Sequence, residues 1–145
     1  MSDSSCPLPA PNDQSDAQRI RRMVEAHRIA VVGLSDDPSR ASYGVARYLV
    51  NAGKEIIPVN PNHATIMGLP CYARLEDVPG SIDLVDVFRR AQYCADVARS
   101  AIAVGAKGIW LQSGIHSPEA KALADRAGLD YVEDRCVMVE HMRAR

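Results

Sequence analysis

The sequence has few aromatic residues, no long apolar run and no excess of basic charge, and each absence narrows what the protein can be. Phe, Trp and Tyr make up 5% of its 145 residues, so aliphatic side chains must form the core. No apolar run is long enough to cross a membrane, and residues 1–11 lack the basic start and apolar stretch of a secretion signal. The net charge of −1 gives no basic tail of the kind that binds nucleic acid. We therefore expect a cytoplasmic protein that binds neither membranes nor nucleic acid.

The sequence also lacks the spacings that predict a metal site or a redox pair. The four cysteines, Cys6, Cys71, Cys94 and Cys136, are 65, 23 and 42 residues apart, so there is no C-x-x-C pair and no zinc spacing. The four histidines include no pair at metal-ligand spacing and no H-E-x-x-H. We expect no metal, and a reducing cytosol disfavours disulfides.

Apolar runs that end in glycine, proline or a polar residue alternate with helical patterns along the chain. The expected strands are residues 29–34, 55–59, 82–88, 107–111 and 129–132, and the expected helices are residues 15–27, 44–52, 93–104 and 117–127. A turn of helix is expected at 75–78 in a crossover that is otherwise loop, and residues 136–142 fit a helix or a strand. Residues 1–14, rich in Ser, Pro, Asp and Asn, predict a flexible tail before a single domain at 15–145.

The expected strands are apolar without clean alternation, which is typical of parallel strands covered on both faces. The sequence therefore predicts an α/β fold, a Rossmann-like, open, doubly wound parallel sheet of five strands with helices on both faces. Right-handed crossovers give, most simply, the strand order 3-2-1-4-5, counted along the chain. Such sheets bind ligands at the carboxyl ends of their strands, so the residues that follow each strand are the candidate site.

The loop after the first expected strand has the composition of a phosphate-binding turn. Gly33 lets the backbone approach a phosphate, Ser35 offers a hydroxyl and an N–H group, and Arg40 is long enough to reach a terminal phosphate or to lie in solvent. We expect Gly44 to begin the next helix and to let that helix pack closely against the strand. A strand-to-helix turn without a ligand needs fewer small and polar residues. The loop is not G-x-G-x-x-G, so a dinucleotide is not the first choice of ligand.

Small, polar or cationic residues also follow the other expected strands. The second strand ends at Asn60 and Pro61, where an NAD site has an acid for the ribose, so NAD is disfavoured. Two arginines after the third strand, Arg89 and Arg90, can complement a multiply phosphorylated ligand, or one can form a salt bridge while the other is solvated. Residues that follow the fourth strand are Gln112, Ser113 and Gly114.

Candidate catalytic residues are few. His116 follows the fourth strand and is the one credible general acid or base, while Cys136 follows a cation, Arg135, that can activate a thiol. Ser113 stands in no G-x-S-x-G elbow, and the chain has no G-x-x-x-x-G-K-[ST] loop. The sequence therefore assigns no catalytic set.

Five short blocks occur in an order found in a known family. They are Gly33-x-Ser35 with Pro38-Ser39-Arg40 and Ser42-Tyr43-Gly44; Ile57-Pro58-Val59-Asn60-Pro61; Asp86-Val87-Phe88-Arg89-Arg90; Gly105-Ala106-Lys107 with Trp110-Leu111-Gln112; and Asp134-Arg135-Cys136. Together they resemble the small stand-alone CoA-binding proteins, which are similar to the N-terminal CoA-binding domain of the succinyl-CoA synthetase α subunit. The resemblance runs from about Ile20 to His141.

This resemblance implies a Rossmann-like fold with CoA or an acyl-CoA as the ligand. It implies that Gly33, Leu34, Ser35, Arg40, Ser42, Tyr43 and Gly44 hold the CoA phosphates, that Asn60 and Pro61 lie alongside the adenosine, and that Phe88, Arg89, Arg90, Gln112, Ser113 and Gly114 surround the rest of the ligand. The synthetase domain has a ligand-contacting lysine after its second strand, where this chain has His63. The phosphorylated histidine of the synthetase belongs to a second domain for which 145 residues leave no room, so ligase activity is not implied.

Three functions follow as hypotheses. The first is a protein that binds CoA or an acyl-CoA without chemistry of its own. The second is a CoA- or nicotinamide-dependent enzyme that uses His116 or Cys136. The third is a CoA-binding subunit that acts with a separate catalytic protein. The expected partners are accordingly a CoA-type small molecule and either another protein or further copies of this chain.

Overall fold

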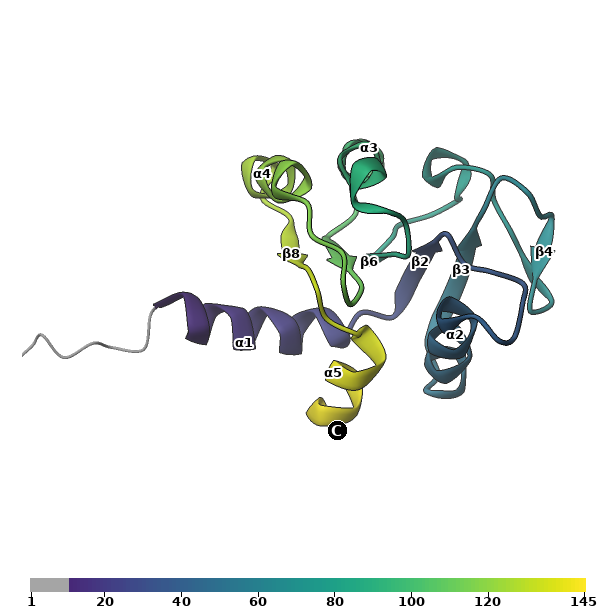
Figure 1. Ribbon diagram of the computed structural model, residues 1–145, viewed down its shortest axis with the longest axis horizontal. Helices are drawn as coiled ribbons and strands as arrows, with labels where there is room; N and C mark the ends of the chain where they lie inside the picture. Colours follow the sequence, from purple (N-terminus) through teal and green to yellow (C-terminus); the bar gives the residue numbers. More distant parts are fainter. Residues whose placement is uncertain (1–10) are drawn as a thin grey trace, which may run out of the picture.

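The computed structural model describes residues 11–145, and they form one parallel sheet with helices on both faces (Figure 1). The strands, in spatial order, are β3 (Glu55–Val59), β2 (Arg28–Val32), β6 (Leu84–Val87), β7 (Gly108–Leu111) and β8 (Asp130–Val132). Helices α1 (Pro11–Val24), α2 (Ala41–Asn51) and α5 (Val137–Ala144) cover one face, and α3 (Ala91–Ala103) and α4 (Pro118–Ala127) cover the other. The predicted class, a Rossmann-like open parallel sheet of five strands, is confirmed.

The predicted strand order is wrong. Counted along the chain, the order is 2-1-3-4-5, because β6 pairs with β2 rather than with β3. Pro58 explains why β3 lies at the edge: proline has no N–H group, so it avoids strands that pair on both sides. The carbonyl of Pro58 faces away from β2 and accepts a hydrogen bond from the Tyr72 N–H group at 3.0 Å. The missing donor therefore lies on the side that carries no further strand of the sheet.

The crossover from β3 to β6 contains more structure than the sequence predicts. Besides the expected turn of helix, η1 (Leu75–Asp77), it holds a small antiparallel hairpin of β4 (Thr65–Ile66) and β5 (Leu69–Pro70). Met67 and Gly68, between them, both have positive φ angles, the backbone of a two-residue hairpin turn. The chain then bonds to the outer edge of β3 through Tyr72.

Helix boundaries follow the local signals closely at α4 and less closely elsewhere. Ser117 accepts a hydrogen bond from the Ala120 N–H group at 3.1 Å, Pro118 occupies the first turn, and Gly128 ends α4 in the left-handed conformation, as predicted. Helix α2 begins at Ala41, three residues before the expected start, and α1 runs 11–24 instead of 15–27. The segment 136–142, for which the sequence fitted either a helix or a strand, lies largely in helix α5. Residues 1–10 of the expected tail lie outside the described residues.

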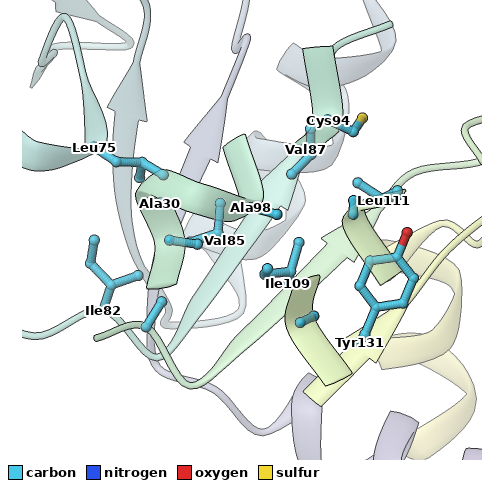
Figure 2. Packing of buried hydrophobic residues seen from close by; sticks show 14 of the residues in the cluster. Ala30, Leu75, Ile82, Val85, Val87, Cys94, Ala98, Ile109, Leu111 and Tyr131 are labelled. Carbon is cyan, nitrogen blue, oxygen red and sulfur yellow. The ribbon is translucent and has the colours of Figure 1, made fainter. Parts of the chain in front are cut away.

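Each face of the sheet carries its own apolar core. Under α3 and α4, residues from alternate strand positions, including Val85, Ile109 and Tyr131, pack against small side chains such as Ala98 (Figure 2). Under α1, α2 and α5, the other strand positions, including Trp110, pack against aliphatic residues of the helices. Every residue of β6 and β7 is buried, and apart from Asp86 these strands contain only apolar residues and glycine.

Among the described residues, 11–145, no helix is both long and apolar enough to cross a membrane.

Candidate functional site

Two cavities open at the carboxyl ends of the strands, and they share Gly33, Phe88 and Arg89 as a common wall. The first, of about 620 Å³, lies between the starts of α2 and α3; we call it the helix-end cavity. Its lining is Gly33, Ser35, Arg40, Ala41, Ser42, Val45, Phe88, Arg89, Arg90, Ala91, Gln112, Ser113, Gly114, Ile115 and Cys136. The second, of about 530 Å³, lies between α3 and the β3–β6 connection; we call it the crossover cavity, and it includes Asn60, Pro61, Arg74 and Tyr93. Together the two cavities form one site along the carboxyl ends of the strands.

Gly33 stands where the two cavities meet, and the protein's own backbone requires a glycine there. Its φ angle is +85°, and a Cβ atom on this residue would lie 2.6 Å from the carbonyl oxygen of Phe88. The Gly33 N–H group donates to the carbonyl of Val59 at 3.0 Å. The close approach of the neighbouring strand end therefore requires a glycine at this position whether or not a phosphate binds there.

Many polar groups of the loop between β2 and α2 form hydrogen bonds within the loop or to the start of α2. The Ser35 N–H group donates to Oγ of Ser42 at 3.0 Å, and Oγ of Ser35 accepts from the Asp37 N–H group at 3.0 Å. Asp37 accepts from both the N–H and the hydroxyl of Ser39, and the N–H bond lowers the pKa of this exposed carboxyl. Ser35 thus holds the loop in shape, and the N–H group that the sequence offers to a phosphate is already bonded.

Helices α2 and α3 both start at the helix-end cavity without a side-chain cap. Their N-cap residues are Arg40 and Arg90, and neither side chain bonds to the first turn, whereas Ser117 caps α4. The first N–H groups of a helix have no partner inside the helix, and the helix dipole places partial positive charge there. Two such ends beside one cavity favour an anion.

Three arginines line the helix-end cavity, and none forms an ion pair with any of the described residues. They are Arg40, Arg89 and Arg90. The guanidinium of Arg89 lies 4.5 Å from the centre of the ring of Tyr93, a residue that lines the crossover cavity. The alternative of one arginine in a salt bridge does not hold in this structure, so the cationic charge stays available to a ligand.

Three of the predicted site residues do not line either cavity. Leu34 is fully buried in the core beneath α2, and the Tyr43 hydroxyl accepts a hydrogen bond from Arg47 on the surface of α2. Gly44 lies inside α2, where a Cβ atom would meet no neighbouring atom within 4 Å, so the expected close packing of helix on strand is wrong. A periodic sequence pattern indicates a helix but not which side of its first turn faces the sheet.

The other strand ends hold their loops in place through side-chain bonds. Nδ2 of Asn60 donates to the Leu34 carbonyl at 3.0 Å, and its Oδ1 accepts from the Asn62 N–H group, so Asn60 ties the loop after β3 to the loop after β2. Oε1 of Gln112 accepts from the N–H group of Val137, which fixes the start of α5 against β7. These residues shape the site from within the loops.

His116 is clamped between two carboxylates beside the helix-end cavity. Its Nδ1 lies 3.0 Å from Glu133 and its Nε2 lies 3.3 Å from Asp134, while Glu133 also accepts from the Tyr131 hydroxyl at 2.8 Å. The hydrogen bond to Glu133 raises the pKa of His116, although the residue is exposed. Burial acts to raise the pKa of Glu133, but the bonds from Tyr131, His116 and Ser117 outweigh it and lower that pKa. With both ring nitrogens engaged, His116 holds two loops together rather than presenting a base.

Replacing Glu133 by glutamine is expected to lower the pKa of His116 toward the ordinary value of about 6.5. The carboxylate that stabilises the imidazolium is then lost, so the ring releases its proton at lower pH. An NMR titration of the imidazole protons measures this directly. Asp134→Asn is the matched control and should cause a smaller decrease, because Asp134 acts on His116 through charge alone. An unchanged His116 titration in Glu133→Gln would contradict this prediction.

Sequence reasoning missed Asp86 as a site feature. Asp86 lies in the centre of β6 and is fully buried, and neither of its carboxyl oxygens has a hydrogen-bond partner among the described residues. Burial raises the pKa of this carboxyl well above its usual value. The signal in the sequence was an acidic residue inside the otherwise apolar stretch 84–88. Tyr93, whose ring lies against the guanidinium of Arg89, was also missed; its signal was an aromatic residue one helical turn after that arginine.

Some candidate groups remain apart from the two cavities. Nδ1 of His63 lies 3.6 Å from Oδ2 of Asp36, and His63 lines neither cavity. Cys136 does line the helix-end cavity, whereas Cys94 is buried behind the start of α3. Within 11–145, no three His, Cys, Asp or Glu residues gather in a way that would hold a metal ion.

Comparisons with known proteins bear on this site. The profile of a family described as CoA binding domain matches residues 27–142. YneT, an uncharacterized protein of Bacillus subtilis, is 40% identical over 127 residues, which cover 88% of this chain and 94% of YneT. A solved structure from Thermus thermophilus has a TM-score of 0.84 and 38% identity, covering 89% of this chain and 98% of that one.

A longer relative matches only in part. The α subunit of an ADP-forming acetate–CoA ligase II from Pyrococcus furiosus is 30% identical over 82 residues. That match covers 56% of this chain but 17% of the ligase subunit, so the similarity concerns one section of the larger protein.

Proposed function

This chain belongs to the CoA-binding domain family, and we propose that it binds CoA or an acyl-CoA along the carboxyl edge of its sheet. One observation carries the proposal. Three arginines that form no ion pair with any described residue and two helix starts without side-chain caps converge on one cavity. CoA carries a pyrophosphate and a further phosphate, and such a multiply charged anion is what this arrangement of donors favours.

The two cavities suggest how the ligand divides between them. We assign the phosphates to the helix-end cavity, against Arg40, Arg89 and Arg90 and the first turns of α2 and α3. The adenosine is assigned to the crossover cavity beside Pro61, and the remaining arm to the side lined by Gln112, Ser113 and Gly114. Arg89 lines both cavities and therefore contributes charge at their junction.

The same geometry favours binding without chemistry. His116 has a carboxylate at each ring nitrogen, and the described cavity lining brings no base beside Cys136. Nucleophilic catalysis needs a nucleophile and a base within hydrogen-bond reach of each other. Incubation with acetate, ATP and CoA should therefore give no acetyl-CoA, and measured turnover would replace this part of the proposal.

Isothermal titration with CoA tests the proposal, with NAD and ATP as comparators. Saturable binding of CoA at micromolar or tighter affinity is expected, with no heat from NAD, because Asn60 stands where an acid would bind the NAD ribose and is occupied by the loops. A protein that is folded but shows no CoA binding would overturn the proposed function.

Arg89→Leu is expected to weaken CoA binding by about 10- to 100-fold, since a hydrogen bond to a charged group contributes about 1.5–3 kcal/mol. Arg99→Leu is the matched control: Arg99 lies on α3, pairs with Asp96 and Glu119, and lines neither cavity. Titration calorimetry on both variants measures the effect. Equal affinities for CoA in the two variants would remove Arg89 from the site.

A subunit that supplies CoA to a catalytic partner is the second candidate function. The partial match to an acetate–CoA ligase subunit favours it, because there a similar section belongs to a larger protein. Its test is whether a purified candidate partner lowers the CoA dissociation constant or consumes the bound CoA. The first function requires neither effect.

A further inference from the structure

Asp86 lies one layer beneath the floor of the helix-end cavity. Its neighbours in the sheet are Val31 on β2 and Trp110 on β7. Strand residues two apart share a face, so Phe88, two residues after Asp86, and Gln112, two after Trp110, form the next layer on that face. Phe88 and Gln112 both line the helix-end cavity. The carboxyl of Asp86 therefore lies between the apolar core and the cavity.

The elements packed on this face offer Asp86 no counter-charge. The buried side chains of α2 and α5 there are uncharged: Ser42, Val45, Ala46 and Leu49 on α2 and Val137 on α5, and α1 adds Met23 and Val24. The charged residues of α5 are engaged elsewhere: Glu140 pairs with Arg135 and Arg143, and His141 bonds to the Tyr48 hydroxyl at 2.7 Å. The titratable and charged residues on the cavity side of Asp86 are those that line the helix-end cavity: Cys136, Arg40, Arg89 and Arg90.

Ionised Asp86 and an anionic ligand would oppose each other. Two residues along a strand span about 6.6 Å, so an anion held at the level of Phe88 lies near enough for strong repulsion through the protein interior. In the ligand-free protein, burial alone raises the pKa of Asp86. A polyanion bound in the cavity above adds repulsion to this carboxylate and therefore raises the pKa further.

We propose that Asp86 couples ligand binding to proton uptake, so that the polyanionic ligand binds the form of the protein in which this carboxyl is neutral. The inference rests on the proposed function, since it concerns the same cavity. By linkage, the affinity falls as pH rises through the range in which Asp86 ionises in the ligand-free protein. The decrease reaches at most tenfold per pH unit, the slope for one proton.

The test is titration calorimetry with CoA between pH 6 and 9, performed at each pH in two buffers of different ionisation enthalpy. The difference between the buffers gives the number of protons taken up on binding. Asp86→Asn keeps a neutral side chain of the same shape and is expected to abolish the uptake that belongs to the protein. The phosphates and thiol of CoA titrate identically with both proteins, so the difference between wild type and variant isolates Asp86.

A greater proton uptake by the wild type, with a flatter pH profile of affinity in Asp86→Asn, supports the inference. Equal uptake and parallel profiles overturn it while leaving the proposed function intact, because both proteins still bind CoA. An absence of CoA binding by the wild type overturns both. If Asp86→Asn does not fold, the wild type alone decides between pH 7.5 and 8.5, above the phosphate pKa of about 6: no uptake at any pH there overturns the inference.

Discussion

Replacing Asp86 by asparagine should stabilise the ligand-free protein, and the gain should grow as the pH rises. The folded protein buries this carboxyl without a partner among the described residues, which raises its pKa well above the usual value. An acid whose pKa is raised on folding does not destabilise the protein at pH values below its pKa in the unfolded chain. Between the unfolded and folded pKa values, the free energy of unfolding decreases as pH rises. The loss is about 1.4 kcal/mol per pH unit over that range. Asparagine does not ionise and avoids this loss.

Thermal unfolding of both proteins between pH 4 and 8 measures the effect. The melting temperature of Asp86→Asn should match that of the wild type near pH 4 and exceed it by roughly 5 °C for each further pH unit, until Asp86 ionises in the folded protein. A variant that is less stable than the wild type at pH 8 would show that the carboxylate has a partner in the folded protein.

Asp83 provides a matched control of opposite sign, in the turn before the same strand. Its carboxylate accepts from the N–H group of Arg28 at 2.9 Å and lies 3.4 Å from Nζ of Lys107. The hydrogen bond from Arg28 lowers the pKa of Asp83, so its contribution is present above the unfolded pKa and is lost as pH falls. Asp83→Asn should therefore be less stable than the wild type at neutral pH. Two Asp→Asn changes only three residues apart should thus move stability in opposite directions.

The layered architecture was predictable because burial dictates composition. Strands β6 and β7 are covered on both faces, so their residues, apart from Asp86, are apolar or glycine and show no alternation. Both ends of helix α4 are indicated by the sequence, the start by Ser117 and Pro118 and the end by Gly128. These signals are local, and each depends on residues that are adjacent in the chain.

Strand order depends on contacts between residues that are distant in the sequence. The simplest order, 3-2-1-4-5, was therefore predicted, and it was wrong. Pro58 indicates that β3 is an edge strand, because proline has no N–H group to donate to a second neighbouring strand. The prediction of the strand order did not take into account which strand residues can donate a backbone hydrogen bond. The hairpin of β4 and β5 was missed for a different reason. Its strands are two residues each, too short for any periodicity to emerge.

The candidate site was predictable as a set of strand ends, and less so residue by residue. A parallel sheet brings the ends of all its strands to one edge, so most of the predicted residues line one of the two cavities. Whether a given side chain points into the cavity depends on its rotation about the helix or strand. Leu34 points into the core and Gly44 into solvent for that reason. Assignment of the remaining residues to CoA stays a proposal.

Gly33→Ala is expected to destabilise the fold by about 3 kcal/mol, and Gly44→Ala is expected to stabilise it by about 0.5–1 kcal/mol. At Gly33 the left-handed backbone costs a non-glycine residue about 1–2 kcal/mol, and the new methyl group, 2.6 Å from the Phe88 carbonyl oxygen, forces the strand ends apart at a further 1–3 kcal/mol. Gly44 lies within α2 with open space around it, so alanine there gains helix propensity without a clash. Urea denaturation of the two variants measures both changes.

This contrast decides how substitutions at the site can be interpreted. Loss of CoA binding in Gly33→Asp would follow from a displaced Phe88 even if no phosphate ever approached Gly33, because the larger side chain meets the same carbonyl oxygen. A binding defect at Gly33 therefore tests the fold first and the ligand second. Arg89, whose side chain lines both cavities and forms no ion pair with any described residue, separates the two. Stability within about 1 kcal/mol of wild type in Gly33→Ala would mean that the strand ends can separate, and Gly33 would then become a valid probe of the ligand.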